Sequence, residues 1–367
     1  MNQGDSRRLL QCLTVAKRPL RVEELAEVLA YDLDGADGEI PTFHGEWRWE
    51  DQEQAVLSAC SSLISIVDSG DSRVVQFSHF SVKEFLTSKR LAKRPAAADG
   101  EDVSQYHILP ESAHTTLTQV CLGVLLRLDD QSDKESAKKI PLAEYAAEHW
   151  DSHAQMENVT SHVGHAMETL FDSDKPYFSA WLRIYCVDPL GGSRRGGLRL
   201  VPEHYKRVTR RISGRNLRRV EGRPVYANPL YYAALYGIHD LVEQLAIKDP
   251  QHVNAFGGDL DFPLLAALWN KHLRVAQLLV EHGANLNGPR PENHMALHEV
   301  VRWCDDAALD AIKFLLKHGA DVNARRDDLS TPLCLAADPF YFKAAQLLLS
   351  HKADVNSRDK ETELRCT

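Results

Sequence analysis

The sequence predicts a mainly α-helical protein that ends in a stack of helical hairpins. Three observations carry this prediction. Asn254, Asn287, Asn323 and Asn356 close four similar stretches at intervals of 33, 36 and 33 residues. A regular period of this length is typical of repeat proteins, whose neighbouring units bury a shared apolar seam. Amphipathic helical patterns also fill most of the chain before the repeats, and only two short β-type runs interrupt them.

Residues 1–92 are expected to form one domain of three helices, a β-hairpin and a final helix. The helical patterns cover residues 7–16, 21–30, 49–60 and 81–92. The β-type runs, 62–68 and 73–80, are joined by a Ser-Gly-Asp-Ser turn that can close a hairpin. Ser81 and Glu84 have the spacing of a capping box at the start of the last helix. This order of elements describes a winged-helix domain.

The charge of this domain argues against DNA as its ligand. Residues 1–90 hold 10 basic and 15 acidic side chains. The third helix would be the one that reads DNA, and it begins with the run Trp-Glu-Asp-Gln-Glu at 49–53. Carboxylates at that position repel phosphates, whose contacts supply most of the affinity for nucleic acid.

A local motif gives a more specific resemblance. FSHFSVKEFLTS, residues 77–88, resembles the strand-to-helix signature F-x-H-x-S-x-x-E-F-L of NACHT-type signalling ATPases of the STAND class. This class includes fungal NACHT–ankyrin proteins and animal NLR receptors, and the resemblance covers about 1–92. It implies that the winged helix is a regulatory element. It also implies that His79 contacts a nucleotide phosphate if an upstream NACHT domain is present. Local packing or helix capping is the alternative role for His79.

The sequence offers no set of catalytic residues. It contains neither a G-x-x-x-x-G-K-[ST] phosphate loop nor a G-x-S-x-G nucleophile elbow. His149 and His153 lie four apart, and His162 and His165 three apart, but no cysteine or carboxylate completes a metal site of obvious spacing. We therefore predict no enzyme activity, no cofactor and no bound metal. The nucleotide-binding core of the resembling family is expected upstream of residue 1.

The middle of the chain divides into a linker, a helical connector and a basic stretch. Residues 93–104 form a polar linker, and 105–188 carry the connector. Its helical patterns cover residues 111–130, 140–155, 161–171 and 175–185. Residues 189–224 are rich in Gly and Arg, and 190–224 hold 11 basic but only 2 acidic side chains. This stretch is expected to be a disordered linker or insertion, a nucleic-acid-binding or nuclear-targeting tract, or a basic helix on an acidic neighbour.

The repeats begin with tight-turn tetrads whose second residue is usually proline. The tetrads are NPLY at 228–231, FPLL at 262–265, MALH at 295–298 and TPLC at 331–334. They resemble the T-P-L-H opening of the ankyrin repeat, so 225–367 is assigned to an α-solenoid of about four ankyrin repeats. Gly283 and Gly319 follow the second helices, and Lys352 replaces this glycine in the last repeat. Three extra residues in the third repeat are expected to lengthen the turn between its helices. One apolar end of the stack is expected to lie open.

Ankyrin stacks bind proteins through their finger turns and the inner helix face. Counting from the tetrads gives this set of candidate partner-binding residues: Tyr232, Tyr236, Trp269, Asn270, Glu299, Arg302, Trp303, Arg325 and Asp327. The resulting hypothesis is a non-catalytic interaction and sensor module from a NACHT–ankyrin signalling protein, with a protein partner on the repeats. The alternative is a nucleic-acid-binding or nuclear-targeted ankyrin protein that uses 190–224.

The cysteines and apolar runs give an expectation about the compartment. The seven cysteines are scattered and include no C-x-x-C pair, which favours reduced thiols. The apolar runs are too short to cross a bilayer, and the first residues lack the apolar core of a signal peptide. A cytoplasmic protein is therefore expected, or a nuclear one if the basic stretch acts in targeting.

Overall fold

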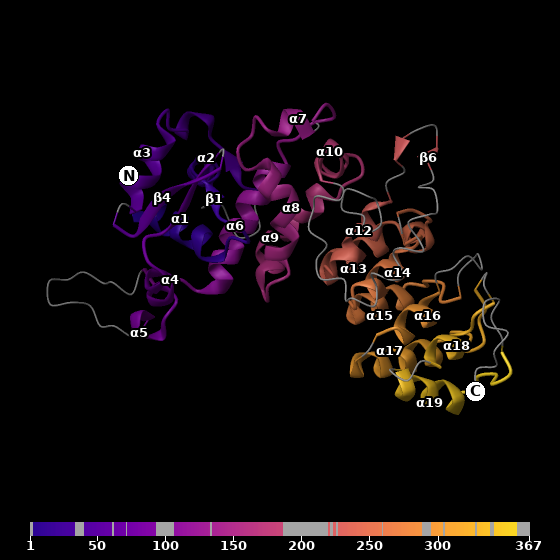
Figure 1. Cartoon of the computed structure of the whole chain (residues 1–367). Coiled ribbons are helices and arrows are strands. Elements are labelled where there is room, and N and C mark those ends of the chain that lie inside the picture. The colour runs from indigo at the N-terminus through magenta and orange to yellow at the C-terminus, as the bar shows by residue number, and fades with distance from the viewer. Residues whose placement is uncertain are drawn as a thin grey trace. The chain divides into compact units, whose positions relative to one another are not determined.

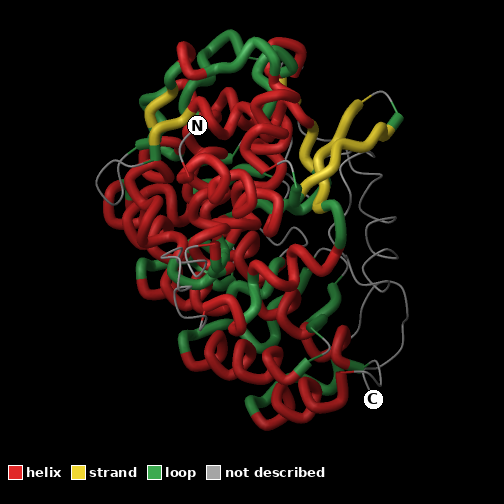
Figure 2. The backbone as a smooth tube through the Cα atoms, turned by 90° about the vertical axis from the view of Figure 1, so that its left-hand side faces the viewer, coloured by secondary structure: helices red, strands yellow, loops and turns green. Residues whose placement is uncertain are grey.

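The computed structural model divides the chain into two compact units, residues 1–186 and 187–367 (Figure 1). It describes residues 3–33, 40–60, 62–70, 72–92, 106–132, 134–185, 219–220, 223–224, 227–258, 260–287, 295–303, 305–326, 329–337 and 341–357. Helices dominate both units, as Figure 2 shows, and the prediction of a mainly α-helical protein is confirmed.

The first unit begins with the predicted winged-helix arrangement. Its helices are α1 (Gln3–Val15), α2 (Val22–Glu27), α3 (Gln52–Cys60), α4 (Phe80–Leu86) and α5 (Lys89–Ala92). The strands β1 (Leu20–Arg21), β4 (Ile64–Ser69) and β5 (Ser72–Phe77) form an antiparallel sheet in the order β1-β5-β4. Gly70 takes a positive φ of 62° in the β4–β5 turn, where glycine carries no steric cost.

Three features of this domain differ from the sequence prediction. The sheet gains β1, since Leu20 pairs with Val75 and so adds a third strand to the expected hairpin. A second small ladder pairs β2 (Tyr31–Asp32) with β3 (Thr42–Phe43), in a region where the sequence predicted no strand. The expected helix 81–92 is two helices, because the chain breaks after α4 and restarts at α5.

Buried Glu24 explains why α2 begins where it does. Its carboxylate accepts the backbone N–H of Arg21 at 2.7 Å and receives Nη1 and Nη2 of Arg18 at 2.8 and 2.6 Å. A glutamate at the third helical position satisfies a free amide of the first turn in this way. Burial alone would raise the pKa of Glu24, but these hydrogen bonds outweigh it and lower the pKa.

The connector follows in the same unit. It consists of α6 (Pro110–Leu125), α7 (Lys134–Ala137), α8 (Ala143–Ala154), α9 (Val159–Leu170) and α10 (Pro176–Ile184). Pro110 and Pro176 occupy first helical positions, where a missing N–H is tolerated. An aromatic cluster forms the core, with the rings of Trp150 and Trp181 edge to face at 5.6 Å. Trp181 Nε1 donates to the carbonyl of Ala147 at 3.0 Å, so this buried indole keeps a hydrogen bond.

Side-chain bonds fasten the winged-helix arrangement to the connector. The carboxylate of buried Glu27 accepts from Arg48 at 2.8 Å and from Arg127 of the connector at 3.2 Å. Gln11 of α1 donates to Ser112 Oγ of α6 at 2.9 Å. Because such bonds join α1 and α2 to α6, the two regions form one unit.

The described residues of the second unit form four helical hairpins, one for each predicted repeat. The pairs are α12 (Pro229–Tyr236) with α13 (His239–Lys248), α14 (Pro263–Trp269) with α15 (Leu273–Glu281), α16 (Ala296–Val301) with α17 (Asp306–Lys317), and α18 (Pro332–Ala336) with α19 (Phe342–Ser350). The helices follow one another from orange to yellow in Figure 1. The described residues of this unit also form a 3-10 turn, η4 (Pro250–Asn254), and two short strands, β6 (Arg219–Val220) and β7 (Arg223–Pro224).

The asparagines that revealed the period also join the repeats. Asn254 Nδ2 donates to the carbonyl of Gly283 at 2.8 Å, and its Oδ1 accepts the backbone N–H of Asn285 at 2.8 Å. Asn287 makes the same two contacts with the third repeat, and Asn323 makes them with the fourth. A pattern seen first as spacing is therefore a ladder of hydrogen bonds between adjacent repeats.

The ends of the second helices take the left-handed backbone that favours glycine and that strains Lys352. Gly283 and Gly319 take φ values of 86° and 93°, and Lys352 takes 68° at the equivalent position. The prediction that the insertion lengthens the turn between the helices holds only in part. The turn before α17 is only one residue longer than the turn before α15, whereas α17 has 12 residues and α15 has 9. Most of the insertion extends the helix, because Asp305 caps it early by accepting from the backbone N–H of Ala308.

Candidate functional site

Four predicted partner-binding residues reach the surface at the carboxyl ends of the first helices. We call Tyr236, Trp269, Asn270 and Arg302 the helix-end stripe. Asn270 is exposed, and the other three are half-buried. Counted from the tetrads, Trp269 and Arg302 hold equivalent positions in the second and third repeats, while Tyr236 and Asn270 do so in the first and second. The stripe therefore crosses three adjacent repeats.

One hydrogen bond and one ion pair join neighbouring repeats at this surface. Asn270 Nδ2 donates to the carbonyl of Leu235 at 2.7 Å, which links the second repeat to the first. Lys271 Nζ lies 2.5 Å from Asp305 Oδ2, which links the second repeat to the third. A surface whose side chains are already positioned loses less conformational entropy when it binds a partner.

Three other predicted residues lie inside the stack. Tyr232, Glu299 and Trp303 are only 1, 2 and 3% exposed. Each first helix is short and packs between its neighbours, so residues in its middle face adjacent repeats. Trp303 follows the end of its helix but lies inward, with Lys271 Nζ 5.8 Å from the centre of its ring. The proposed contact surface is therefore limited to the helix-end stripe and the finger turns.

The finger turns are described in part. Arg325 is exposed on the turn between the third and fourth repeats. Asp327 lies outside the described residues, as do Asp259, Arg290, Glu292 and Asp328 of the other turns. The basic stretch 190–224 lies outside them as well, except for the backbone of β6 and β7.

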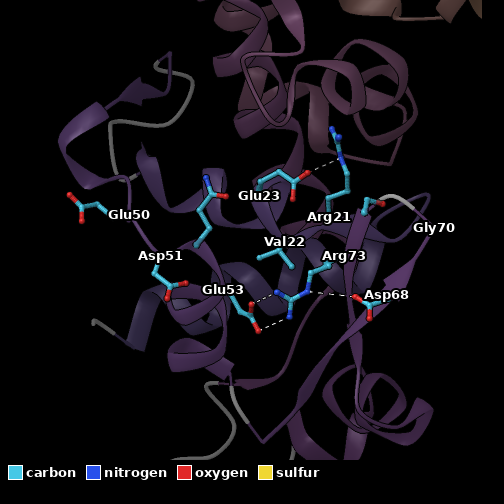
Figure 3. Close-up of a pocket in the computed structure, with 11 residues that line it drawn as sticks. Arg21, Val22, Glu23, Glu50, Asp51, Glu53, Asp68, Gly70 and Arg73 are labelled. Atoms are coloured by element: carbon cyan, nitrogen blue, oxygen red, sulfur yellow. Dashed lines mark hydrogen bonds and ion pairs between the residues drawn. The ribbon is translucent and has the colours of Figure 1, made fainter.

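A polar groove of about 870 Å³ opens where α2, α3 and the β4–β5 hairpin meet (Figure 3). Its carboxylates are Glu23, Glu50, Asp51, Glu53 and Asp68, and its only basic lining residues are Arg21 and Arg73. Both arginines already have carboxylate partners: Arg73 bridges Glu53 and Asp68, and Arg21 Nε lies 3.4 Å from Glu23. The groove occupies the face that a DNA-binding winged helix would use, and its excess of carboxylates opposes phosphate.

His79 caps α4. It is the residue before the first turn, and its Nδ1 accepts the backbone N–H of Ser81 at 3.2 Å. Nδ1 also lies 2.7 Å from Ser81 Oγ. The expected capping box at Ser81 and Glu84 is therefore replaced by a histidine cap two residues earlier. His79 is exposed, and because the cap occupies Nδ1, only Nε2 could meet a phosphate.

A chain of hydrogen bonds that the sequence did not reveal joins the segment just after α1 to the connector. The backbone N–H of Lys17 donates to Tyr145 Oη at 3.1 Å, and Tyr145 Oη lies 2.9 Å from His153 Nε2. His153 Nδ1 lies 2.8 Å from His114 Nδ1. The backbone N–H of Lys17 can only donate. We therefore assign the hydroxyl of Tyr145 as the donor to His153 Nε2, and the Nδ1–H of His153 as the donor to His114 Nδ1. Both imidazoles are then neutral.

Burial explains the titration of these two histidines. Desolvation lowers the pKa of His153 to about 3 and that of His114 to about 4, and the positive charge of Lys17 acts in the same direction. His149 and His153 were considered as metal ligands because of their spacing. His149 is half-buried, whereas His153 is buried and belongs to this chain of hydrogen bonds. Within the described residues, no group of three or more His, Cys, Asp and Glu side chains is placed to hold a metal ion.

The four cysteines among the described residues are of two kinds. Cys12, Cys60 and Cys121 are free and buried, and burial raises the pKa of Cys12 and Cys60 to about 12. Cys334 of α18 is disulfide-bonded, so the expectation of reduced thiols is wrong for this residue. That expectation rested on spacing in the sequence, whereas proximity in the fold decides which cysteines pair. No helix in the described part of the chain combines the length and apolar content that a bilayer crossing requires.

Comparison with protein families agrees with this architecture. Residues 264–359 match the family of ankyrin repeats, in three copies. The chain contains ankyrin repeats. Residues 2–97 match the GPI inositol-deacylase winged helix domain. The predicted winged-helix domain and ankyrin stack are therefore confirmed as parts of this chain.

Several curated proteins are similar over part of their length. The azaphilone pigments biosynthesis cluster protein L of Monascus ruber is 28% identical over 76% of this chain and 55% of its own length. The ankyrin repeat and SAM domain-containing protein 6 of Mus musculus is 33% identical over 26% of this chain and 11% of its own length. The ankyrin repeat protein nuc-2 of Neurospora crassa is 28% identical over 28% of this chain and 9% of its own length. The chain thus spans about half of the Monascus relative and about a tenth of the other two.

Proposed function

We propose that this chain is a non-catalytic interaction module whose ankyrin repeats bind a protein partner through the helix-end stripe. The observation that supports this most is the stripe itself. Tyr236, Trp269, Asn270 and Arg302 come from three successive repeats, and these repeats are joined beside the stripe by the Asn270–Leu235 hydrogen bond and the Lys271–Asp305 ion pair. Aromatic and arginine side chains are the usual anchors of protein interfaces.

The winged-helix domain is proposed to act as a regulatory element. Its acidic groove, with Glu50, Asp51 and Glu53 at the start of the third helix, is poorly suited to nucleic acid, which supports a role within the protein or toward another protein. The resemblance of residues 77–88 to NACHT-type ATPases and the match to a winged-helix family point in the same direction. In a chain that carries an upstream NACHT domain, His79 Nε2 is proposed to contact the nucleotide phosphate.

A selection experiment on the full-length protein tests the interaction. Proteins or peptides selected from a display library are titrated against wild type and against Trp269→Ala, Tyr236→Ala and Arg302→Ala. We expect at least one of these variants to bind the selected ligand tenfold or more weakly with its fold retained. Ile247→Ala, at an exposed position on α13, is the matched control. Ligands that bind all four variants like the wild type would place the binding surface elsewhere.

A further inference from the structure

A buried pair of histidines lies where the winged-helix arrangement meets the connector. His153 of α8 is 0% exposed, and His114 of α6 is 7% exposed. Their ring centres are 5.0 Å apart, and their Nδ1 atoms are 2.8 Å apart. At this distance only one proton fits between the two Nδ1 atoms, whichever ring carries it. A proton on both would replace the hydrogen bond with two opposed N–H groups.

Tyr145 imposes the same requirement on the other side of His153. Its Oη accepts the backbone N–H of Lys17 at 3.1 Å and lies 2.9 Å from His153 Nε2. His153 Nε2 can accept the tyrosine hydroxyl only while this nitrogen carries no proton. A proton added there removes the acceptor of a buried O–H, which costs more inside a protein than in water. A positive charge on either histidine therefore breaks a hydrogen bond of the chain.

The basic groups around the pair also oppose a positive charge on it. Burial lowers the pKa of both histidines, and the charge of Lys17 lowers it further. His149 of α8 acts on the pKa of His153 in the same direction. The carboxylate of Glu148 lies 3.7 Å from Nε2 of His149, so this acidic group is turned toward the outer histidine.

The buried carboxylates nearby offer the pair no counter-charge. The carboxylate of Glu24 of α2 already receives both terminal nitrogens of Arg18. Asp151 of α8 precedes His153 by two residues, and side chains two apart on a helix do not face each other. The buried residues of α9 and α10, which pack against α6 and α8, are all apolar. The fold is therefore built to hold this pair only in its neutral form.

We propose that His114, His153 and Tyr145 form a proton-sensitive latch, which holds the winged-helix arrangement on the connector and releases it when the histidines become charged. Two charged rings 5.0 Å apart repel each other, and release of the joint lets both reach water. The hydrogen bond from Gln11 to Ser112 also crosses this joint, but neither side chain titrates between pH 5 and pH 7. The latch belongs to the first unit and the helix-end stripe to the second, so the proposal does not rest on the proposed function.

Three buried thiols can report where the fold opens. Cys12 of α1 and Cys121 of α6 are both 0% exposed. Burial raises the pKa of Tyr145, and these two thiols are close enough to raise it further, which places them beside the latch. Cys60 of α3 lies within the winged-helix arrangement, with its Sγ 3.6 Å from the carbonyl of Ser6. Release of the latch exposes Cys12 and Cys121 alone, whereas global unfolding exposes all three.

Labelling of the full-length protein with 4,4′-dithiodipyridine, which reacts with thiols at acidic pH, measures this exposure. Mass spectrometry resolves each cysteine, and each rate is divided by the rate of the same cysteine in the urea-unfolded chain at the same pH. From pH 7 to pH 5 we expect the normalised rates of Cys12 and Cys121 to rise about tenfold or more, and that of Cys60 to rise less than about threefold.

Two substitutions assign this rise to the latch. His114→Gln keeps an amide oxygen that can accept from His153 Nδ1 but removes one titrating ring, so it should show a smaller rise than the wild type. His165→Gln, at an exposed position on α9, should match the wild type. Thermal unfolding at pH 7 should show that both variants are folded.

Three outcomes would overturn the latch. The first is no rise at Cys12 and Cys121, and the second is an equal rise at all three cysteines, which indicates global unfolding. The third is a folded His114→Gln variant whose rise equals that of the wild type. If His114→Gln does not fold, the comparison of Cys12 with Cys60 in the wild type decides alone. No step measures binding by the helix-end stripe, so a failure of the proposed function leaves this result unchanged.

Discussion

Acidification from pH 7 to pH 5 is expected to loosen the joint between α1 and the connector. The folded protein keeps His114 and His153 neutral, because burial lowers their pKa values to about 4 and about 3. The unfolded chain binds a proton at each imidazole with a pKa of 6.5. A lowered folded-state pKa gives stability that is fully present above pH 6.5 and is lost as the pH falls toward the folded value.

The expected loss of free energy of unfolding follows from the width of the pH range in which these histidines are protonated only in the unfolded chain. Each pH unit in which the unfolded histidine is protonated and the folded one is neutral changes the free energy of unfolding by about 1.4 kcal/mol. Between pH 6.5 and pH 5 each histidine therefore removes about 2 kcal/mol, and the pair removes about 4 kcal/mol at most. This result requires only that both folded pKa values lie below 5. Glu24 does not interfere, because its lowered carboxyl pKa places its loss of stability at more acidic pH.

Hydrogen exchange measured by mass spectrometry over α6 and α8 reports on the joint directly. The opening free energy of these helices, corrected for the intrinsic exchange rate, should fall by about 2 to 4 kcal/mol from pH 7 to pH 5. The double variant His114→Gln/His153→Gln should be less stable at pH 7 but nearly independent of pH in this range. His165→Gln, at an exposed position on α9, should behave like wild type. A flat profile in the wild type, or an equal slope in the double variant, would refute the reasoning.

Two further predictions concern the repeat stack. Asn287→Ala removes the bonds to Gly319 and Asp321 and should lower the free energy of unfolding by about 2 kcal/mol in urea denaturation, whereas Asn356→Ala should change it by less than about 0.5 kcal/mol. Equal effects of the two variants would show that the ladder does not join repeats. Lys352→Gly should raise the free energy of unfolding by about 1 kcal/mol, because φ at this residue is 68°. An unchanged or lower melting temperature would contradict strain at this residue.

The repeat stack could be predicted well because its stabilising contacts recur at a fixed spacing. The asparagine period and the proline-containing tetrads located all four helical hairpins, and each asparagine with a following repeat makes the bonds that its position implies. His298, the last residue of the third tetrad, links adjacent repeats, since its Nε2 lies 3.1 Å from the carbonyl of Ser330. Local patterns of this kind are readable because each repeat contacts only its neighbours.

Contacts between distant segments could not be predicted in the same way. His114 and His153 are 39 residues apart and belong to different helices, so no spacing rule brings them together. The pairing of β1 with β5 involves two residues and gives no periodic signal. Tyr232 and Trp303 were assigned to the partner surface because aromatic residues are common there, but the packing of neighbouring repeats buries both. Burial depends on tertiary contacts that residue type alone does not specify.

The most direct test of the central claim is a comparison of Trp269→Ala with Ile247→Ala in the full-length protein, using a ligand selected on the wild type. If the helix-end stripe is the partner-binding surface, Trp269→Ala binds that ligand at least tenfold more weakly, and Ile247→Ala binds it like wild type. Thermal unfolding of both variants should show that the stack remains folded. Unchanged affinity in a folded Trp269→Ala variant, together with unchanged affinity in Tyr236→Ala and Arg302→Ala, would contradict the claim.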